Sequence, residues 1–123
     1  MHKRCLVVDD SRVSRMMIAG FLRELQPDWE VLEAGDGQAA VDCAGEFQPS
    51  LVTLDVNMPV MDGFEAAERL RTLLPAATLV LLTANVQSAS KARAEALGVH
   101  FLGKPITEAV VRQALALWEA DHG

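Results

Sequence analysis

Five short apolar runs alternate along this chain with five segments of helical periodicity, and this alternation limits the fold more than any other feature. The predicted strands cover residues 5–8, 30–33, 51–54, 79–82 and 99–102. The predicted helices cover residues 13–25, 38–47, 64–74, 90–97 and 108–118. Strands and helices that alternate in this way form βαβ units. The sequence therefore predicts an α/β fold with a five-stranded parallel sheet.

The polarity of each run indicates its place in the sheet. Residues 5–8, 51–54 and 79–82 are apolar without alternation, as expected of central parallel strands that are covered on both faces. The run 30–33 is more polar and suits an edge strand. Ser11 and Thr107 are placed to cap the first and last helices, and Gly98 stands where the fourth helix should end.

The last predicted helix carries two apolar rows at helical spacing. One row is Val111, Leu115 and Trp118, and the other is Val110, Ala114 and Leu117. One row should face the sheet. The other is either a further part of the core or part of a surface that binds a partner.

The whole-chain properties exclude several classes of protein. A chain of 123 residues, half of them hydrophobic, can bury a core, and we expect one domain over residues 1–123. The formal net charge of -6 argues against nucleic acid as a direct partner. We find no apolar stretch of spanning length, and two isolated cysteines indicate neither a disulfide nor a metal pair. The predicted location is the cytoplasm, away from any membrane.

Polar residues follow four of the five predicted strands. The first strand leads into Asp9 and Asp10, the third into Asp55, the fourth into Thr83 and the fifth into Lys104. All strands of a parallel sheet point the same way, so these side chains should meet beyond one edge. After Asp55, a proline at position 59 and an Asp-Gly pair at 62–63 predict a turn.

Each of these residues has an ordinary structural explanation when it is taken alone. The Asp9–Asp10 pair could cap a helix, Thr83 could belong to a turn, and Lys104 could be a solvated surface lysine. Their joint arrival at one edge favours a functional site.

Three carboxylates in one pocket repel one another, by about 4 kcal/mol for each close pair at an effective dielectric constant near 20. Lys104 alone cannot neutralise them. An all-oxygen site selects a hard cation, so we expect Mg²⁺ held by Asp10 and Asp55, with Asp9 orienting a ligand water. The cation and Lys104 would stabilise the charge of a phosphoryl group, and Thr83 would donate a hydrogen bond to it. Asp55 is the predicted nucleophile and would form an acyl phosphate.

These residues resemble those of a known family. The sequence has Asp9-Asp10 after a short apolar strand, Leu54-Asp55-Val-Asn-Met-Pro59-Val-Met-Asp-Gly63, Leu82-Thr83-Ala84, and Lys104-Pro105. These four motifs, in this order, resemble the response-regulator receiver domain of two-component signalling, and in layout the stand-alone receivers of the chemotaxis type. The resemblance covers essentially the whole chain. It implies a flavodoxin-like (βα)5 three-layer sandwich with strand order 2-1-3-4-5.

The resemblance also implies roles for the site residues. Asp55 would be the phosphoacceptor, and Lys104 would pair with the phosphoryl group. The bond from Lys104 to Pro105 would be cis. The implied Mg²⁺ ligands are Asp10, Asp55, the backbone carbonyl of Asn57 and, through water, Asp9.

Further residues would control the response to phosphorylation. Thr83 would move toward the phosphoryl oxygen and Phe101 would swing inward with it, so that two pre-existing conformations change their balance. Residues 90–118 would form the readout surface. Asn57 and Asn85 stand where family members control the attacking water and so the lifetime of the acyl phosphate. Ala84 is small enough to leave the site open to phosphate donors.

The predicted function is therefore a phosphorylation-controlled switch and not an enzyme, because its chemistry is limited to its own phosphorylation and slow autodephosphorylation. The implied partners are a sensor histidine kinase or phosphotransfer protein, a downstream target protein and a phosphatase. We expect a monomer or a weak dimer, since His100 and Phe101 occupy the place where dimeric relatives carry acidic residues.

Three alternatives remain open at this point. A haloacid-dehalogenase-like phosphohydrolase would also use an aspartyl phosphate, but it needs a second acid where this chain has Asn57. A flavodoxin-like cofactor binder would need a phosphate loop after the first strand, where the acidic pair would repel a phosphate. The chain could also be a receiver fragment of a longer regulator or hybrid kinase.

Overall fold

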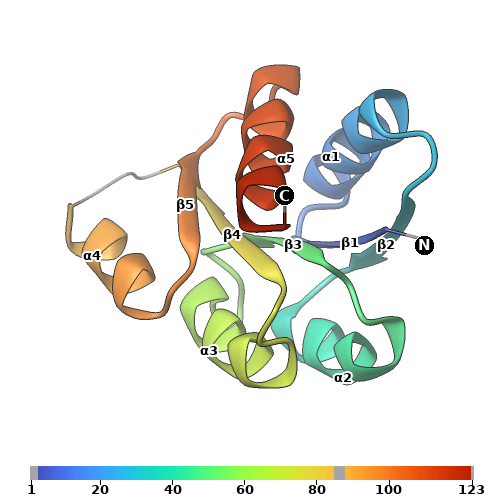
Figure 1. Ribbon diagram of the computed structural model, residues 1–123. Coiled ribbons are helices and arrows are strands. Elements are labelled where there is room, and N and C mark those ends of the chain that lie inside the picture. Colours follow the sequence, from blue (N-terminus) through green and yellow to red (C-terminus); the bar gives the residue numbers. More distant parts are fainter. Residues whose placement is uncertain (1–2, 85–87, 123) are drawn as a thin grey trace.

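The computed structural model describes residues 3–84 and 88–122, and within them five strands alternate with five helices (Figure 1). The strands are β1 (Arg4–Val8), β2 (Glu30–Ala34), β3 (Leu51–Asp55), β4 (Thr78–Thr83) and β5 (His100–Gly103). The helices are α1 (Arg12–Leu25), α2 (Gly37–Phe47), α3 (Gly63–Leu73), α4 (Ser88–Ala96) and α5 (Glu108–His122). All ten predicted elements are confirmed, with α5 extending furthest beyond its predicted end.

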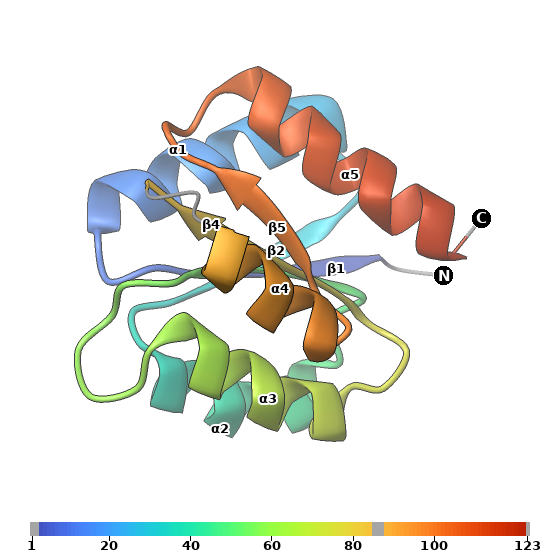
Figure 2. The ribbon, with the colours of Figure 1, turned by 90° about the vertical axis from the view of Figure 1, so that its left-hand side faces the viewer.

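The sheet is parallel throughout, with the order β2-β1-β3-β4-β5. Helices α1 and α5 cover one face, and α2, α3 and α4 cover the other, which gives three layers (Figures 1 and 2). This is the predicted flavodoxin-like (βα)5 sandwich. The polar run is an edge strand as predicted, because β2 pairs only with β1.

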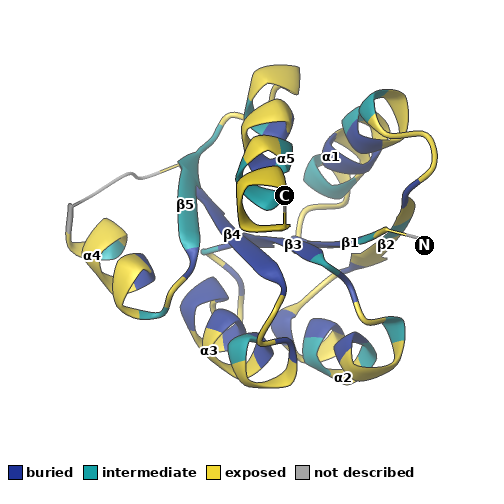
Figure 3. Cartoon of the chain, viewed as in Figure 1, coloured by how far each residue is buried: buried dark blue, intermediate teal, exposed yellow. Residues whose placement is uncertain are grey.

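The core consists of two layers of apolar side chains, one on each face of the sheet. Alternate residues of each central strand enter opposite layers, as the two-residue period of a strand requires. In β3, Leu51 packs under α1 and α5, whereas Val52 and Leu54 pack over α2 and α3. Every residue of β3 and β4 is buried, as Figure 3 shows for the centre of the sheet. This burial explains the absence of polar alternation in both sequences.

Both apolar rows of α5 serve the core. Val111 and Ala114 are buried, and the other four residues of the two rows are partly buried against the same cluster. The helix continues to His122 because side chains near its end contact the amino-terminal edge of the sheet. Trp118 Nε1 donates to Ser50 Oγ at 3.1 Å, and Thr78 Oγ1 donates to Asp121 Oδ2 at 2.7 Å.

The predicted helix boundaries have the expected local causes. The Ser11 side chain accepts from the backbone of Ser14 at 3.3 Å, and Thr107 Oγ1 accepts from the backbone of Val110 at 3.2 Å. Gly98 ends α4 with a φ of +71°, in the left-handed region that glycine adopts without strain. None of the described helices combines the length and the apolar composition that crossing a membrane would require.

Candidate functional site

Alternation along the strands directs three charged side chains of the predicted site toward the same face of the sheet. Cys5, Val7 and Leu51 pack on the α1 and α5 side of the sheet. Asp9 comes two residues after Val7, and Asp55 four residues after Leu51, so both point to that side. Lys104 follows Leu102, which packs there as well. The carboxyl ends of β1, β3 and β5 therefore deliver two carboxylates and an ammonium group to one place.

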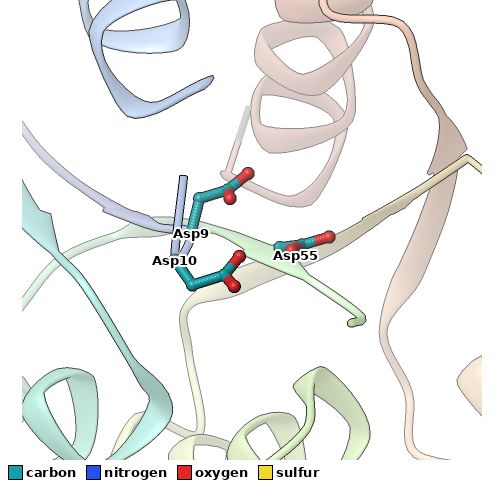
Figure 4. Close-up of side chains that lie close together, drawn as sticks. All are labelled: Asp9, Asp10 and Asp55. Carbon is teal, nitrogen blue, oxygen red and sulfur yellow. The ribbon is translucent and has the colours of Figure 1, made fainter. Parts of the chain in front are cut away.

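The three predicted acids meet at these strand ends. One carboxylate oxygen from each of Asp9, Asp10 and Asp55 lies within 4.8 Å of the others, and Figure 4 shows the three side chains gathered beside the end of β3. Asp9 and Asp55 are buried, whereas Asp10 is exposed to solvent. The cluster is thus deep on one side and open to an incoming ligand on the other.

Lys104 contacts two of the three acids. Its Nζ lies 3.1 Å from Asp9 Oδ2 and 3.3 Å from Asp55 Oδ1. Burial lowers the pKa of Lys104, but the hydrogen bonds and ion pairs with the two carboxylates outweigh it and leave the pKa raised. The other oxygen of Asp9 accepts from the backbone N–H of Ser11 at 2.9 Å. Asp9 is therefore held at both oxygens.

The pKa of Asp55 is raised by its surroundings. Burial raises the pKa of Asp55, and the nearby Asp9 carboxylate raises it further. Lys104 and the backbone N–H of Asn57 act in the opposite direction without cancelling these effects. Two carboxylates share one ammonium group, and the third is not neutralised by any described side chain.

This arrangement fits a hard divalent cation. The close donors are all carboxylate oxygens, their charge exceeds that of the single lysine, and the exposed Asp10 leaves room for water ligands. Oxygen-only sites of this kind suit Mg²⁺, which keeps several waters and takes one or two carboxylates. Bound there, the ion would supply positive charge to neutralise the acids and to stabilise a negatively charged ligand.

The Asp62-Gly63 pair does more than form the predicted turn. Asp62 caps α3, since its side chain accepts from the backbone of Glu65 at 2.9 Å. Gly63 lies against the end of β3, where an added Cβ would stand 2.7 Å from Val56 Cα and closer still to the carbonyl oxygen of Asp55. A side chain at position 63 would therefore push directly on the backbone that carries Asp55.

The remaining predicted residues lie around this centre. Thr83 is buried at the end of β4, one residue beyond Leu82, which pairs with Asp55 in the sheet. The backbone N–H of Lys104 donates to the carbonyl oxygen of Thr83 at 2.7 Å, and the bond from Lys104 to Pro105 is cis as predicted.

The residues predicted to switch or tune the site differ in exposure. Phe101 is half-buried and packs on the face covered by α2, α3 and α4. Asn57 and Ala84 are exposed, and Asn85 lies outside the described residues. The predicted roles of these four residues remain predictions.

A comparison with protein families identifies the chain. The model of the response regulator receiver domain matches residues 5–116. The chain belongs to this family. A receiver domain is generally a signalling module without catalytic turnover, and Mg²⁺ and a phosphoaspartate are general features of the family.

Individual relatives agree with this assignment. Chemotaxis protein CheY of Thermotoga maritima is 34% identical over 117 residues, which cover 94% of this chain and 96% of that protein. A protein-glutamate methylesterase/protein-glutamine glutaminase of Caldanaerobacter subterraneus is 40% identical over 105 residues, 83% of this chain. This receiver domain spans only 28% of that methylesterase, and about the same share of the next two relatives.

Solved structures show the same fold. The chemotaxis response regulator CheY4 of Vibrio cholerae superposes with a TM-score of 0.85 at 29% identity, covering 96% of this chain and 99% of that one. The response regulator domain of Thermotoga maritima CheB gives a TM-score of 0.78 at 31% identity, covering 99% and 95%. Receiver domains thus occur alone and within larger proteins among its relatives.

Sequence reasoning missed two contributors to the site. Arg15 of α1 donates from its Nη1 to the backbone carbonyl of Asp9 at 2.6 Å, and nothing in the sequence distinguishes it from the other arginines of that helix. The close approach of Gly63 to β3 was also missed. The only sequence signal was that a glycine, and not another turn residue, follows Asp62.

Proposed function

We propose that this receiver domain accepts a phosphoryl group on Asp55 in a Mg²⁺-dependent reaction and changes its binding to a partner protein as a result. The observation that carries the proposal is the cluster of Asp9, Asp10 and Asp55 within 4.8 Å, with Lys104 bridging two of them, in a member of this family. The cluster supplies a nucleophilic carboxylate, oxygen ligands for a cation, and an ammonium group for the phosphoryl oxygens.

The residues of the cluster have distinct parts in this chemistry, and Asp55 has two. A carboxylate oxygen of Asp55 attacks the phosphorus of a phosphohistidine, the bond from phosphorus to the imidazole nitrogen breaks, and the nitrogen keeps the electron pair. Lys104 exchanges its contacts with Asp9 and Asp55 for a contact with the new phosphoryl group. Asp10, Asp55 and the Asn57 carbonyl are the proposed ligands of Mg²⁺, and Asp9 reaches it through water. The charge that develops on the equatorial oxygens then faces two positive groups.

The proposed donor is a sensor histidine kinase or a phosphotransfer protein. Support for a docked donor comes from large apolar side chains on the two segments that follow the acids. Val13, Met16 and Met17 are exposed at the start of α1, and Val60 is fully exposed in the loop after β3. Val60 also has a φ of +70°, which is unfavourable for a β-branched residue. A protein that covers Asp55 would bury these side chains.

The proposed output is a change at residues 90–118, the predicted readout surface. Thr83 and Phe101 would change position together when Asp55 is phosphorylated. One contact supports a link to α4: the guanidinium of Arg93 lies 4.3 Å from the ring centre of Phe64, the second residue of α3. The end of β3 at Asp55 therefore packs against Gly63, and the next residue, Phe64, contacts Arg93 of α4. We further propose a cytoplasmic location, and a phosphatase and a downstream protein as partners.

The proposal is tested by phosphorylating the purified chain with acetyl phosphate and Mg²⁺ and measuring the intact mass. We expect one phosphoryl group per chain, none after chelation of Mg²⁺, and none in Asp55→Asn. Asp42→Asn is the matched control, because Asp42 is an aspartate of α2 whose carboxylate accepts only from Gln38 among the described side chains. Labelling that persists in Asp55→Asn would contradict the proposal. Sustained turnover of many phosphate esters would favour the phosphohydrolase instead.

A further inference from the structure

The side chain of Asp10, the exposed acid of the cluster, makes no contact that fixes its position among the described residues. The Asp10 carboxylate has no hydrogen bond or ion pair within the part of the chain that the structure describes, whereas Asp9 and Asp55 both contact Lys104. The direction in which Asp10 points therefore depends on its backbone. Anything that fixes the peptide group before Asp10 therefore limits the places that its carboxylate can reach.

Arg15 fixes that peptide group. Its Nη1 donates a hydrogen bond of 2.6 Å to the carbonyl oxygen of Asp9, which belongs to the peptide unit that joins Asp9 to Asp10. A peptide unit is planar, so holding this oxygen limits the rotation that would turn the Asp10 Cα away from the site. A hydrogen bond from a guanidinium is also stronger than one between neutral groups.

Arg15 is itself held from a second element. Its Nε lies 3.3 Å from Glu33 Oε1 on β2, and the arginine side chain is only 18% exposed. Gly35, which follows β2, borders the guanidinium, because a Cβ added there would stand 3.5 Å from Nη1, at ordinary contact distance. Arg15 thus joins the edge strand to the acidic turn through two directed contacts.

We infer that Arg15 is a positioning residue that aims Asp10 at the cation and so determines how tightly the site binds metal. This inference rests on the proposed function, because it takes Asp10 as a metal ligand. Arg15 has two opposed effects on a bound cation. Its charge repels the ion, and Glu33 offsets that charge, whereas its hydrogen bond orders the ligand. The two effects predict opposite results when the arginine is removed.

The test measures the binding of Mn²⁺, which substitutes for Mg²⁺ at oxygen sites, by following free Mn²⁺ with electron paramagnetic resonance. We expect Arg15→Met to raise the dissociation constant about tenfold, the lower end of the effect seen for residues that orient metal ligands. Arg15→Lys keeps the charge but carries all its donors on one nitrogen, so its dissociation constant should lie between those of the wild type and Arg15→Met. Glu33→Gln should weaken binding by a smaller factor, because the hydrogen bond to Asp9 remains.

Arg12→Met is the matched control. Arg12 is the exposed first residue of α1, and among the described residues no hydrogen bond or ion pair involves its side chain. It carries the same charge one turn away, so its loss should leave Mn²⁺ binding unchanged or slightly tighter. Circular dichroism checks that each variant is folded, and if Arg15→Met is not, Arg15→Lys and Glu33→Gln decide the question.

Two failures can be told apart. If Arg15→Met binds Mn²⁺ as tightly as the wild type or more tightly, Arg15 acts only through its charge and the inference is wrong, while the proposed function stands. If the wild type binds no Mn²⁺, or binds it equally well as Asp10→Asn, the metal site itself is wrong and both proposals fall. A loss of thermal stability without a change in the dissociation constant would also overturn the inference, because it would indicate a merely structural contact.

Discussion

Replacing Gly63 by alanine tests how the backbone around Asp55 is packed. An alanine Cβ at this position would stand 2.7 Å from Val56 Cα and 3.0 Å from the carbonyl carbon of Asp55. Carbon atoms in contact prefer a separation of about 3.5–4.0 Å, so α3 and the end of β3 would have to separate by about 1 Å. The three atoms nearest to this Cβ belong to the backbone, which cannot turn aside as a flexible side chain can. The backbone N–H of Gly63 also donates to the carbonyl oxygen of Val56 at 2.9 Å.

The expected cost follows from these contacts. Overpacking in a well-packed interior costs about 1–3 kcal/mol, and the better helix propensity of alanine offsets part of it. We expect Gly63→Ala to lower the free energy of unfolding by about 2 kcal/mol. For 123 residues, 1 kcal/mol corresponds to about 4 °C in the midpoint of thermal unfolding, so the midpoint should fall by about 8 °C.

The assay is thermal and urea unfolding followed by circular dichroism, with Gly20→Ala as the matched control. Gly20 is exposed in the middle of α1, and no atom lies within 4 Å of an added Cβ. The same substitution should therefore stabilise the protein there, by about 0.5–1 kcal/mol. A Gly63→Ala variant as stable as the wild type would refute the reasoning, because α3 and the end of β3 would then not approach as closely as described.

Two further predictions concern polar groups outside the cluster of Asp9, Asp10 and Asp55. Thr53 Oγ1 is buried without a hydrogen-bond partner among the described residues, and it lines an apolar cavity of about 10 Å³. Thr53→Val should therefore raise the free energy of unfolding, measured by urea titration, by about 1 kcal/mol. A decrease would mean that the hydroxyl has a partner. The hydrogen bond from Thr78 and the nearby His100 lower the pKa of Asp121, so this carboxylate stabilises the fold above its unfolded pKa of about 3.9 and loses that effect as the pH falls through the lower folded value. The destabilisation caused by Asp121→Asn should therefore be largest near neutral pH and shrink below about pH 4, and a constant difference across that range would contradict the linkage.

Local signals in the sequence were sufficient to predict the elements and a parallel sheet, whereas the strand order came from the family resemblance. Unbroken apolar runs mark β1, β3 and β4 as covered on both faces, and helical spacing marks the segments between them. The direction of a parallel sheet then brings Asp9, Asp10, Asp55 and Lys104 together without any knowledge of side-chain contacts. Each of these residues was found because it follows its strand directly along the chain.

The features that were missed depend on contacts between distant parts of the chain. The extension of α5 rests on Thr78 and Asp121, which are 43 residues apart in the sequence. The contact of Arg15 with Glu33 joins α1 to a strand 18 residues further on. Neither pairing leaves a periodic trace, because each partner alone is an ordinary polar residue in a suitable element. Gly63 was read only as a turn residue, since a requirement for space is visible only when the neighbouring backbone is placed.

On the proposed function, cation binding at this site requires both a rigid frame and an unbalanced charge. Carboxylates on flexible segments would move apart and lower their repulsion, leaving little to be gained from an ion. Here Gly63 packs against the backbone at Asp55, and Arg15 holds the peptide before Asp10, so the acids cannot separate freely. The pKa of Asp55 is raised, first by burial and then by the Asp9 carboxylate, which together outweigh Lys104. Loosening either support should therefore weaken metal binding even though every acid is retained, which links the effects expected of Gly63→Ala and Arg15→Met.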